Sequence, residues 1–163
     1  MRYHNITKDD MLNGDGLRVV LWLAGCEHAC PDCQNPVTWD INGGLEFDEA
    51  AKEELFAELR KDYISGITLS GGDPLHTANR KEVGKLIGEI SRQFPTKTIW
   101  LYTGYDWNKI SGLDFIHKVD VVIDGRYIKE QRDVNLAWRG SANQDVIDVK
   151  LSLKCGKKVL HCK

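Results

Sequence analysis

Three cysteines stand within eight positions of one short segment, GCEHACPDC, at residues 25–33. Cys26, Cys30 and Cys33 follow directly after LRVVLWLA (17–24), an apolar run rich in β-branched and aromatic residues. Such a run is typical of a strand that is buried on both faces. The segment therefore predicts a loop of potential metal ligands at the end of a buried strand.

Strand-like and helix-like patterns alternate along the rest of the chain. The predicted strands cover residues 17–24, 66–72, 97–105, 119–125 and 146–153. The predicted helices cover residues 47–63, 77–94 and 106–113, with Asp48 as the N-cap of the first, and 131–145 is predicted to be a long loop. This alternation indicates β/α units and a parallel sheet.

The length of the chain limits how many such units it can hold. A full eight-unit barrel takes about 250 residues, and this chain has 163, which also suits one core. We therefore expect a single domain over residues 1–163 with an α/β fold. The expected architecture is an open partial (β/α) barrel of about five or six units with a mostly parallel sheet, and the alternative is a flat doubly wound sheet.

Charge and hydropathy exclude some partners. Lys and Arg total 22 and Asp and Glu total 24, a formal net charge of −2, whereas nucleic-acid binders usually carry a basic excess. No stretch approaches the roughly 18 consecutive apolar residues of a membrane span, and the N-terminus lacks the apolar core of a signal peptide. We expect a cytoplasmic protein with no nucleic-acid or membrane partner, in which thiols stay reduced.

Reduced thiols at this spacing predict a metal site rather than disulfides. A structural zinc site usually draws four ligands from two separated pairs, but these three lie in a single loop. A [4Fe-4S] cluster has four irons that each take a thiolate, so three cysteines leave one iron open to a substrate. We favour the cluster, while a zinc site completed by His28, Cys155 or Cys162, and unliganded thiols, remain open alternatives.

Glycine-containing turns follow the next predicted strands. They are SGGD at 70–73, TGY at 103–105 and DG at 124–125. The carboxyl ends of parallel strands meet on one rim, where sites assemble in β/α folds. Each turn also fits an ordinary strand end, and Asp124 is favoured as a turn cap rather than a site residue.

Several other side chains carry separate expectations. Arg18, early in a buried strand, is expected to pair with an acid or to lie at the edge of that strand, because an unpaired buried charge is costly. His28 is expected to face solvent or a partner. Cys155 and Cys162 are favoured as spare thiols on the C-terminal tail over a second metal site with His161.

The cysteine segment with its surroundings, NGDGLRVVLWLAGCEHACPDCQNPVTWD at 13–40, resembles the leading motif of radical S-adenosylmethionine activating enzymes for glycyl-radical proteins. SGGDPL (70–75), TGY (103–105), VDVVIDGRY (119–127) and WRGSANQ (138–144) are similar to the shortest branch of that family, which acts on anaerobic ribonucleoside-triphosphate reductase. The resemblance covers nearly the whole chain.

The resemblance implies a [4Fe-4S] cluster and S-adenosyl-L-methionine as cofactors, with Cys26, Cys30 and Cys33 as the cluster ligands. It implies cofactor contacts by Ser70, Gly71, Gly72, Asp73, Thr103, Asp32 and Asn143, and no catalytic side chain beyond the cluster and cofactor. The polar loop around Arg139 is expected to contact the cofactor or a partner. The family often has an aromatic residue where this chain has Asp32, so packing of this side chain against adenine is not expected.

The implied reaction is reductive cleavage of S-adenosylmethionine to a 5'-deoxyadenosyl radical, which abstracts hydrogen from a glycine of the large reductase subunit. The implied electron donor resembles flavodoxin or ferredoxin. Such a radical needs a dry site, which a short partial barrel does not seal by itself, so we expect a laterally open site that a protein substrate closes. The alternatives are an activase of another glycyl-radical enzyme, a non-catalytic zinc-binding interaction module and a simple electron carrier.

Overall fold

The structure, a computed structural model, describes residues 1–162. The strands are β1 (Arg2–Asp10), β2 (Arg18–Leu23), β3 (Leu45–Glu46), β4 (Gly66–Gly71), β5 (Thr98–Tyr102), β6 (Val121–Asp124) and β7 (Asp145–Asp148). The helices are α1 (Glu49–Leu59), α2 (Arg80–Gln93), α3 (Trp107–Ile110) and α4 (Val149–Cys155), and the 3-10 turns are η1 (Pro36–Thr38), η2 (Ile116–Lys118) and η3 (Lys129–Gln131). Among the described residues, no helix is both long and apolar enough to cross a bilayer.

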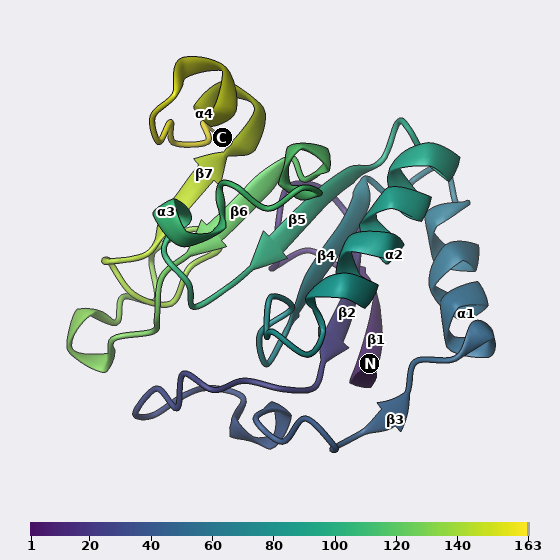
Figure 1. The fold of residues 1–163 in the computed structure, drawn as a ribbon, viewed down its shortest axis with the longest axis horizontal. Coiled ribbons are helices and arrows are strands. Elements are labelled where there is room, and N and C mark those ends of the chain that lie inside the picture. Colours follow the sequence, from purple (N-terminus) through teal and green to yellow (C-terminus); the bar gives the residue numbers. More distant parts are fainter. Residues whose placement is uncertain (163) are drawn as a thin grey trace.

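All seven strands form one sheet in the order β3-β1-β2-β4-β5-β6-β7 (Figure 1). β2, β4, β5 and β6 are parallel to one another, whereas β1, β3 and β7 are antiparallel to their neighbours. The parallel centre therefore contains fewer β/α units than the five or six that we expected. The sheet ends at β3 and at β7, and its description as a partial barrel stays a prediction.

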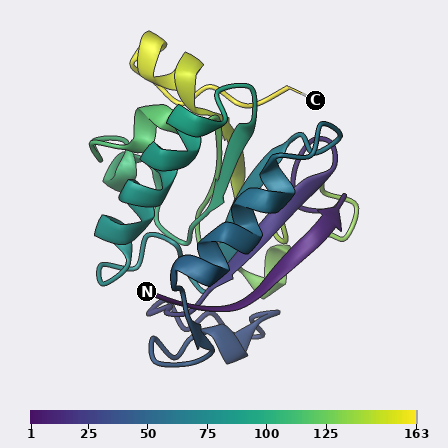
Figure 2. The ribbon, with the colours of Figure 1, turned by 90° about the vertical axis from the view of Figure 1, so that its right-hand side faces the viewer.

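The predicted helices over 47–63 and 77–94 are confirmed in shortened form as α1 and α2. Asp48 caps α1 as expected, because its side chain accepts a hydrogen bond from the backbone N–H of Ala51 at 2.9 Å. Figure 2 shows both helices against the same face of the sheet.

The strand predicted over 146–153 is wrong in its second half. β7 ends at Asp148, whose side chain accepts from the N–H of Leu151 at 2.9 Å and so caps α4. Gly156 ends that helix in the left-handed conformation, with φ of 68°. β1 was not predicted, because Ile6 is its only buried residue and the strand carries no apolar run.

Side chains on the central strands alternate between two different layers. On one face, Leu21 of β2, Leu69 of β4 and Leu101 of β5 belong to the large apolar core beneath the helices. The residues that follow or precede them point to the opposite face, where Trp100, Val121 and Ile123 form a smaller cluster with Tyr102, Trp138 and Val146. The sheet therefore has an apolar face under the helices and a mixed face that loops cover.

Arg18 lies on the mixed face and is fully buried. Its guanidinium donates to the carbonyls of Asp15, Ile67 and Thr98 and to the hydroxyls of Thr68 and Thr98, at 2.7–2.9 Å. Within residues 1–162 it pairs with no carboxylate, so the first of the two expected alternatives, an acid partner, is wrong; Arg18 instead lies at the end of its strand, as the first residue of β2. Burial lowers the pKa of this guanidinium to about 10, and neutral acceptors from β4, β5 and the preceding loop satisfy its donors instead.

We expect Arg18→Ala to be one of the most destabilising single changes in the chain. It removes five hydrogen bonds and leaves buried carbonyls unpaired, which should cost about 3 kcal/mol. Thermal unfolding should shift down by roughly 6–12 °C. Arg60→Ala is the matched control, because Arg60 is exposed and pairs with Glu53, and a surface pair of this kind contributes under about 1 kcal/mol; equal shifts for the two variants would contradict the role given to Arg18.

Candidate active site

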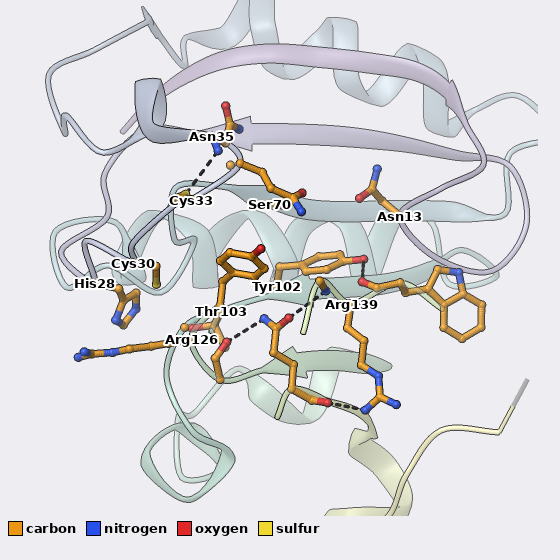
Figure 3. Close-up of a pocket in the computed structure, with 18 of the residues that line it drawn as sticks. Asn13, His28, Cys30, Cys33, Asn35, Ser70, Tyr102, Thr103, Arg126 and Arg139 are labelled. Atoms are coloured by element: carbon orange, nitrogen blue, oxygen red, sulfur yellow. Dashed lines mark hydrogen bonds between the residues drawn. The ribbon is translucent and has the colours of Figure 1, made fainter. Parts of the chain in front are cut away.

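A pocket of about 460 Å³ lies on the mixed face of the sheet, at the carboxyl ends of the parallel strands (Figure 3). Five parts of the chain line it: the segment before β2 that contains Leu12 and Asn13, the cysteine loop after β2, the turn after β4, the turn after β5 and the long loop over 125–144. The strand ends that were predicted to meet on one rim therefore do meet. The pocket faces away from the helices, because its walls include Trp22, Ser70 and Tyr102 on the alternate positions of β2, β4 and β5.

Cys26, Cys30 and Cys33 all line this pocket and are all half-buried. Burial raises the pKa of the Cys26 thiol to about 11, and the Sγ of Cys33 accepts a hydrogen bond from the N–H of Asn35 at 3.4 Å. Within residues 1–162, no three His, Cys, Asp or Glu side chains are grouped closely enough to hold a single metal ion. The three thiols are thus brought to one pocket.

One buried carboxylate ties the cysteine loop to the ends of β4 and β5. The Oδ2 atom of Asp73 lies 2.6 Å from the Nε2 of His28 and accepts from the hydroxyl of Thr103 at 3.0 Å and from the N–H of Gly104 at 2.9 Å. Its Oδ1 accepts from the N–H of Leu75 at 2.8 Å. Because a carboxylate in this arrangement only accepts, the Nε2 of His28 carries the proton that it shares with Asp73.

The expectation that His28 faces solvent or a partner is wrong. Its ring is buried, stacks edge-on against Tyr105 with ring centroids 4.6 Å apart, and is fixed by Asp73. The hydroxyl of Tyr105 donates to Glu27 at 2.8 Å, and burial followed by this hydrogen bond raises the pKa of Tyr105 to about 12. The histidine between the first two cysteines is therefore an internal anchor of their loop.

Gly71 and Gly72 are explained by close approach of the chain to itself. Gly71 has φ of +112°, and a Cβ there would lie 2.3 Å from backbone atoms of Leu23. A Cβ at Gly72 would lie 2.5 Å from the carbonyl oxygen of Gly25 and 2.7 Å from that of Thr38. Any larger residue would push the cysteine loop away from the end of β4.

The residues expected to contact a cofactor fall into two groups. Ser70, Gly71, Gly72 and Thr103 line the pocket. Asp73, Asp32 and Asn143 are not part of its lining.

The residues of the second group make contacts outside the pocket lining. Asp73 is buried, and its carboxylate contacts His28, Thr103 and Gly104. Asp32, in the left-handed region with φ of 56°, pairs with Lys129 at 2.9 Å on the surface. Asn143 donates to the carbonyl of Arg126 at 2.8 Å, while its own Oδ1 is buried and has no hydrogen-bond partner among residues 1–162.

The remaining candidates from the sequence have structural roles. Asp124 accepts from the N–H groups of Trp107 and Asp145 and from Lys158, so it joins the start of α3 to β7 and to the tail, as a capping residue would. Arg139 lines the pocket, but its guanidinium donates to the carbonyl of Gln144 at 2.5 Å.

The tail cysteines lie away from the pocket. Cys155 and Cys162 are exposed, and the described residues place no metal-binding group of side chains around them. His161 is instead near Asp15, with 2.9 Å between Nε2 and Oδ2.

Sequence analysis did not select Trp22, Tyr102 and Arg126, which also line the pocket. Side chains alternate between the two faces of a strand, and this pattern could have identified Trp22 and Tyr102. Each lies near the carboxyl end of its strand, close to the predicted turns, on the face that carries the pocket. Tyr102 donates its hydroxyl to the carbonyl of Trp138, and burial raises its pKa well above the usual value. Figure 3 shows Arg126 on the same side of the pocket as His28 and Cys30.

Asp73→Asn should loosen the cysteine loop. The NH2 group of the new Asn side chain would face groups that are themselves hydrogen-bond donors. At least one of the buried hydrogen bonds of Asp73 would then be lost, which should lower the free energy of unfolding by about 2 kcal/mol. We expect a lower melting temperature and faster loss of bound metal to a chelator. Asp106→Asn is the control, because Asp106 is exposed and its side chain makes no capping hydrogen bond with α3. Equal melting temperatures and equal rates of metal loss in the two variants would contradict the anchoring role of Asp73.

Comparison with known proteins identifies a family for the chain. The family model of a 4Fe-4S single cluster domain matches residues 12–147. A protein of enterobacteria phage T4 named anaerobic ribonucleoside-triphosphate reductase-activating protein is 45% identical over 144 residues, which are 88% of this chain and 92% of that protein.

Two bacterial proteins carry the same name. That of Escherichia coli K12 is 38% identical over 150 residues, 90% of this chain and 97% of its own length. That of Haemophilus influenzae is 39% identical over 158 residues, 93% of this chain and all of its own length. The chain belongs to the family of anaerobic ribonucleoside-triphosphate reductase-activating proteins, within the 4Fe-4S single-cluster domains.

Proposed function

We propose that this protein is a radical S-adenosylmethionine activase that installs the glycyl radical of anaerobic ribonucleoside-triphosphate reductase. The observation that carries the proposal is the convergence of three half-buried thiols, and no fourth, at one side of a pocket built from the strand ends. Family membership supports the 4Fe-4S cluster and the reductase as partner. The cofactor, the radical chemistry and the glycine are the proposal.

The donor set fits such a cluster. Four irons each take a ligand, so Cys26, Cys30 and Cys33 leave one iron for the amino and carboxylate groups of S-adenosylmethionine. When bound, the reduced cluster supplies the electron that cleaves the sulfonium to methionine and a 5'-deoxyadenosyl radical, which takes a hydrogen atom from glycine. A structural zinc site would instead require a fourth protein ligand, and the two remaining cysteines, Cys155 and Cys162, are exposed and not part of the pocket lining.

The protein's own groups then bind and orient the cofactor. Ser70 lines the pocket, and its hydroxyl makes no hydrogen bond with the described residues, so it is available to a ligand. Arg126 is exposed beside the cysteines and makes no ion pair within residues 1–162, which suits it to a carboxylate. Trp22 and Tyr102 give the pocket aromatic walls.

The pocket requires a partner to exclude water. Leu12 and Val134 belong to its lining although they are 79% and 78% exposed, so the lining includes apolar side chains that face solvent. Exposed apolar side chains around an opening favour contact with another protein. A glycine-bearing segment of the reductase would cover this rim and dry the site, as radical chemistry requires.

Anaerobic reconstitution with iron and sulfide tests the cluster assignment. The wild-type protein should take up about four irons and, once reduced, should form 5'-deoxyadenosine from S-adenosylmethionine. Cys30→Ala should lose both properties, because it removes a ligand. Cys155→Ala removes an exposed thiol outside the pocket and should keep both; a fully active Cys30→Ala variant would show that the ligands are assigned wrongly.

Val134→Asp should separate cofactor cleavage from activation of the reductase. A carboxylate on the apolar rim should weaken reductase binding by at least about tenfold, measured as the glycyl-radical signal in electron paramagnetic resonance against reductase concentration. Cleavage without reductase should not change. Leu45→Asp, at a 62% exposed site on β3 that is not part of the pocket lining, serves as the control, and equal loss in both variants would argue against docking at this rim.

A further inference from the structure

A second cavity lies on the opposite side of the sheet from the pocket, between α2 and the segment that leads into η2. Its volume is about 470 Å³. Four cations line it, Arg80, Lys81, Lys85 and Lys118, against one carboxylate, that of Asp114. We call this cavity the basic groove. No residue lines both the basic groove and the pocket.

The charges of the basic groove are not neutralised by ion pairs in the described part of the chain, although Arg80 donates a hydrogen bond to the carbonyl of Leu75 at 2.6 Å. None of the four makes an ion pair within residues 1–162, and the three lysines are exposed. The acids of α2 are engaged away from the groove: Glu82 by the N-terminal amine at 2.8 Å and Glu89 by Lys52 at 3.2 Å. A concave surface with one sign of charge concentrates its field and attracts the opposite charge.

The basic groove reaches the cysteine loop through two ring contacts. The guanidinium carbon of Arg80 lies 5.0 Å from the centre of the Tyr105 ring. That ring lies 4.6 Å from the ring of His28, which stands between Cys26 and Cys30 in sequence. The loop that would hold the cluster is therefore approached from the pocket on one side and from the basic groove on the other.

We propose that the basic groove docks the acidic face of a one-electron donor protein, which reduces the cluster from the side opposite the pocket. The inference rests on the proposed function and names the partner that this function requires. In the transfer, the donor is oxidised by one electron and the cluster is reduced by one, and no atom moves between them. The basic groove suits an electron donor rather than the reductase. The reductase has to cover the pocket, so a donor that binds on the opposite side of the sheet could still reduce the cluster.

Stopped-flow reduction of the cluster-loaded protein tests the docking site. The probe is a purified acidic flavodoxin in its fully reduced form, mixed anaerobically at low and high salt. Replacing Lys81, Lys85 and Lys118 together by Gln should lower the second-order rate of cluster reduction by about tenfold at low salt. It should also remove most of the salt dependence, because exposed charges act through a screened field.

The control variant replaces Arg92, Lys154 and Lys157 by Gln, an equal change in net charge at exposed positions outside the groove. It should reduce at the wild-type rate. Reduction by dithionite, and the 5'-deoxyadenosine that dithionite-reduced protein forms, should be the same in all three proteins. If dithionite-reduced wild type forms no 5'-deoxyadenosine, the proposed function fails, whatever the flavodoxin rates are.

Two outcomes would overturn the groove assignment while leaving the proposed function intact. One is a flavodoxin rate for the groove variant that equals that of the control variant. The other is an unchanged flavodoxin rate with weakened reductase binding, measured by fluorescence anisotropy, which would make the basic groove a reductase contact instead.

Discussion

The carboxylate of Asp73 is the interaction on which the rest of the site depends. It accepts hydrogen bonds from the cysteine loop through His28, from the turn after β4 through Leu75, and from the turn after β5 through Thr103 and Gly104. Three segments far apart in sequence are thereby fixed to one buried atom group. Such a network is worth most when each of its members is satisfied, and here the carboxylate has a donor at both oxygens.

This arrangement changes the role that Asp73 and the neighbouring glycines play. The resemblance implied that they touch the cofactor. Asp73 is buried and is not part of the pocket lining, whereas Gly71 and Gly72 line the pocket and also make room for the backbone of Leu23, Gly25 and Thr38. All three hold the cysteine loop beside β4, and their contacts with a cofactor stay a prediction.

The sequence predicted the parts of the fold that leave a local signature. The apolar run before Cys26, the amphipathic pattern of α2 and the cap at Asp48 all correspond to observed elements. β1 was missed, because a strand with a single buried residue resembles a polar loop. The end of β7 was missed because Val149–Cys155 alternates like a strand until Asp148 is recognised as a cap.

For the site, sequence spacing identified the rim but not the contacts across it. That three strand ends meet follows from parallel order, whereas the pairing of His28 with Asp73, 45 positions apart, depends on the final packing of loops. The sequence also did not predict that neutral carbonyls surround Arg18. The carbonyls of β4 and β5 become acceptors for its guanidinium only once the strands are aligned.

The two-layer character of the central strands has a consequence for how this chain can vary in evolution. Adjacent positions of β2, β4 and β5 serve opposite layers, so inserting or deleting one residue would exchange the helix-facing and pocket-facing sets wholesale. Selection should remove insertions and deletions from these strands, whereas substitutions that change the size of a side chain should be tolerated more often. Length variation among homologues is then confined to the connections, and an alignment gap inside β4 would mark a protein whose pocket-facing side chains are no longer in place.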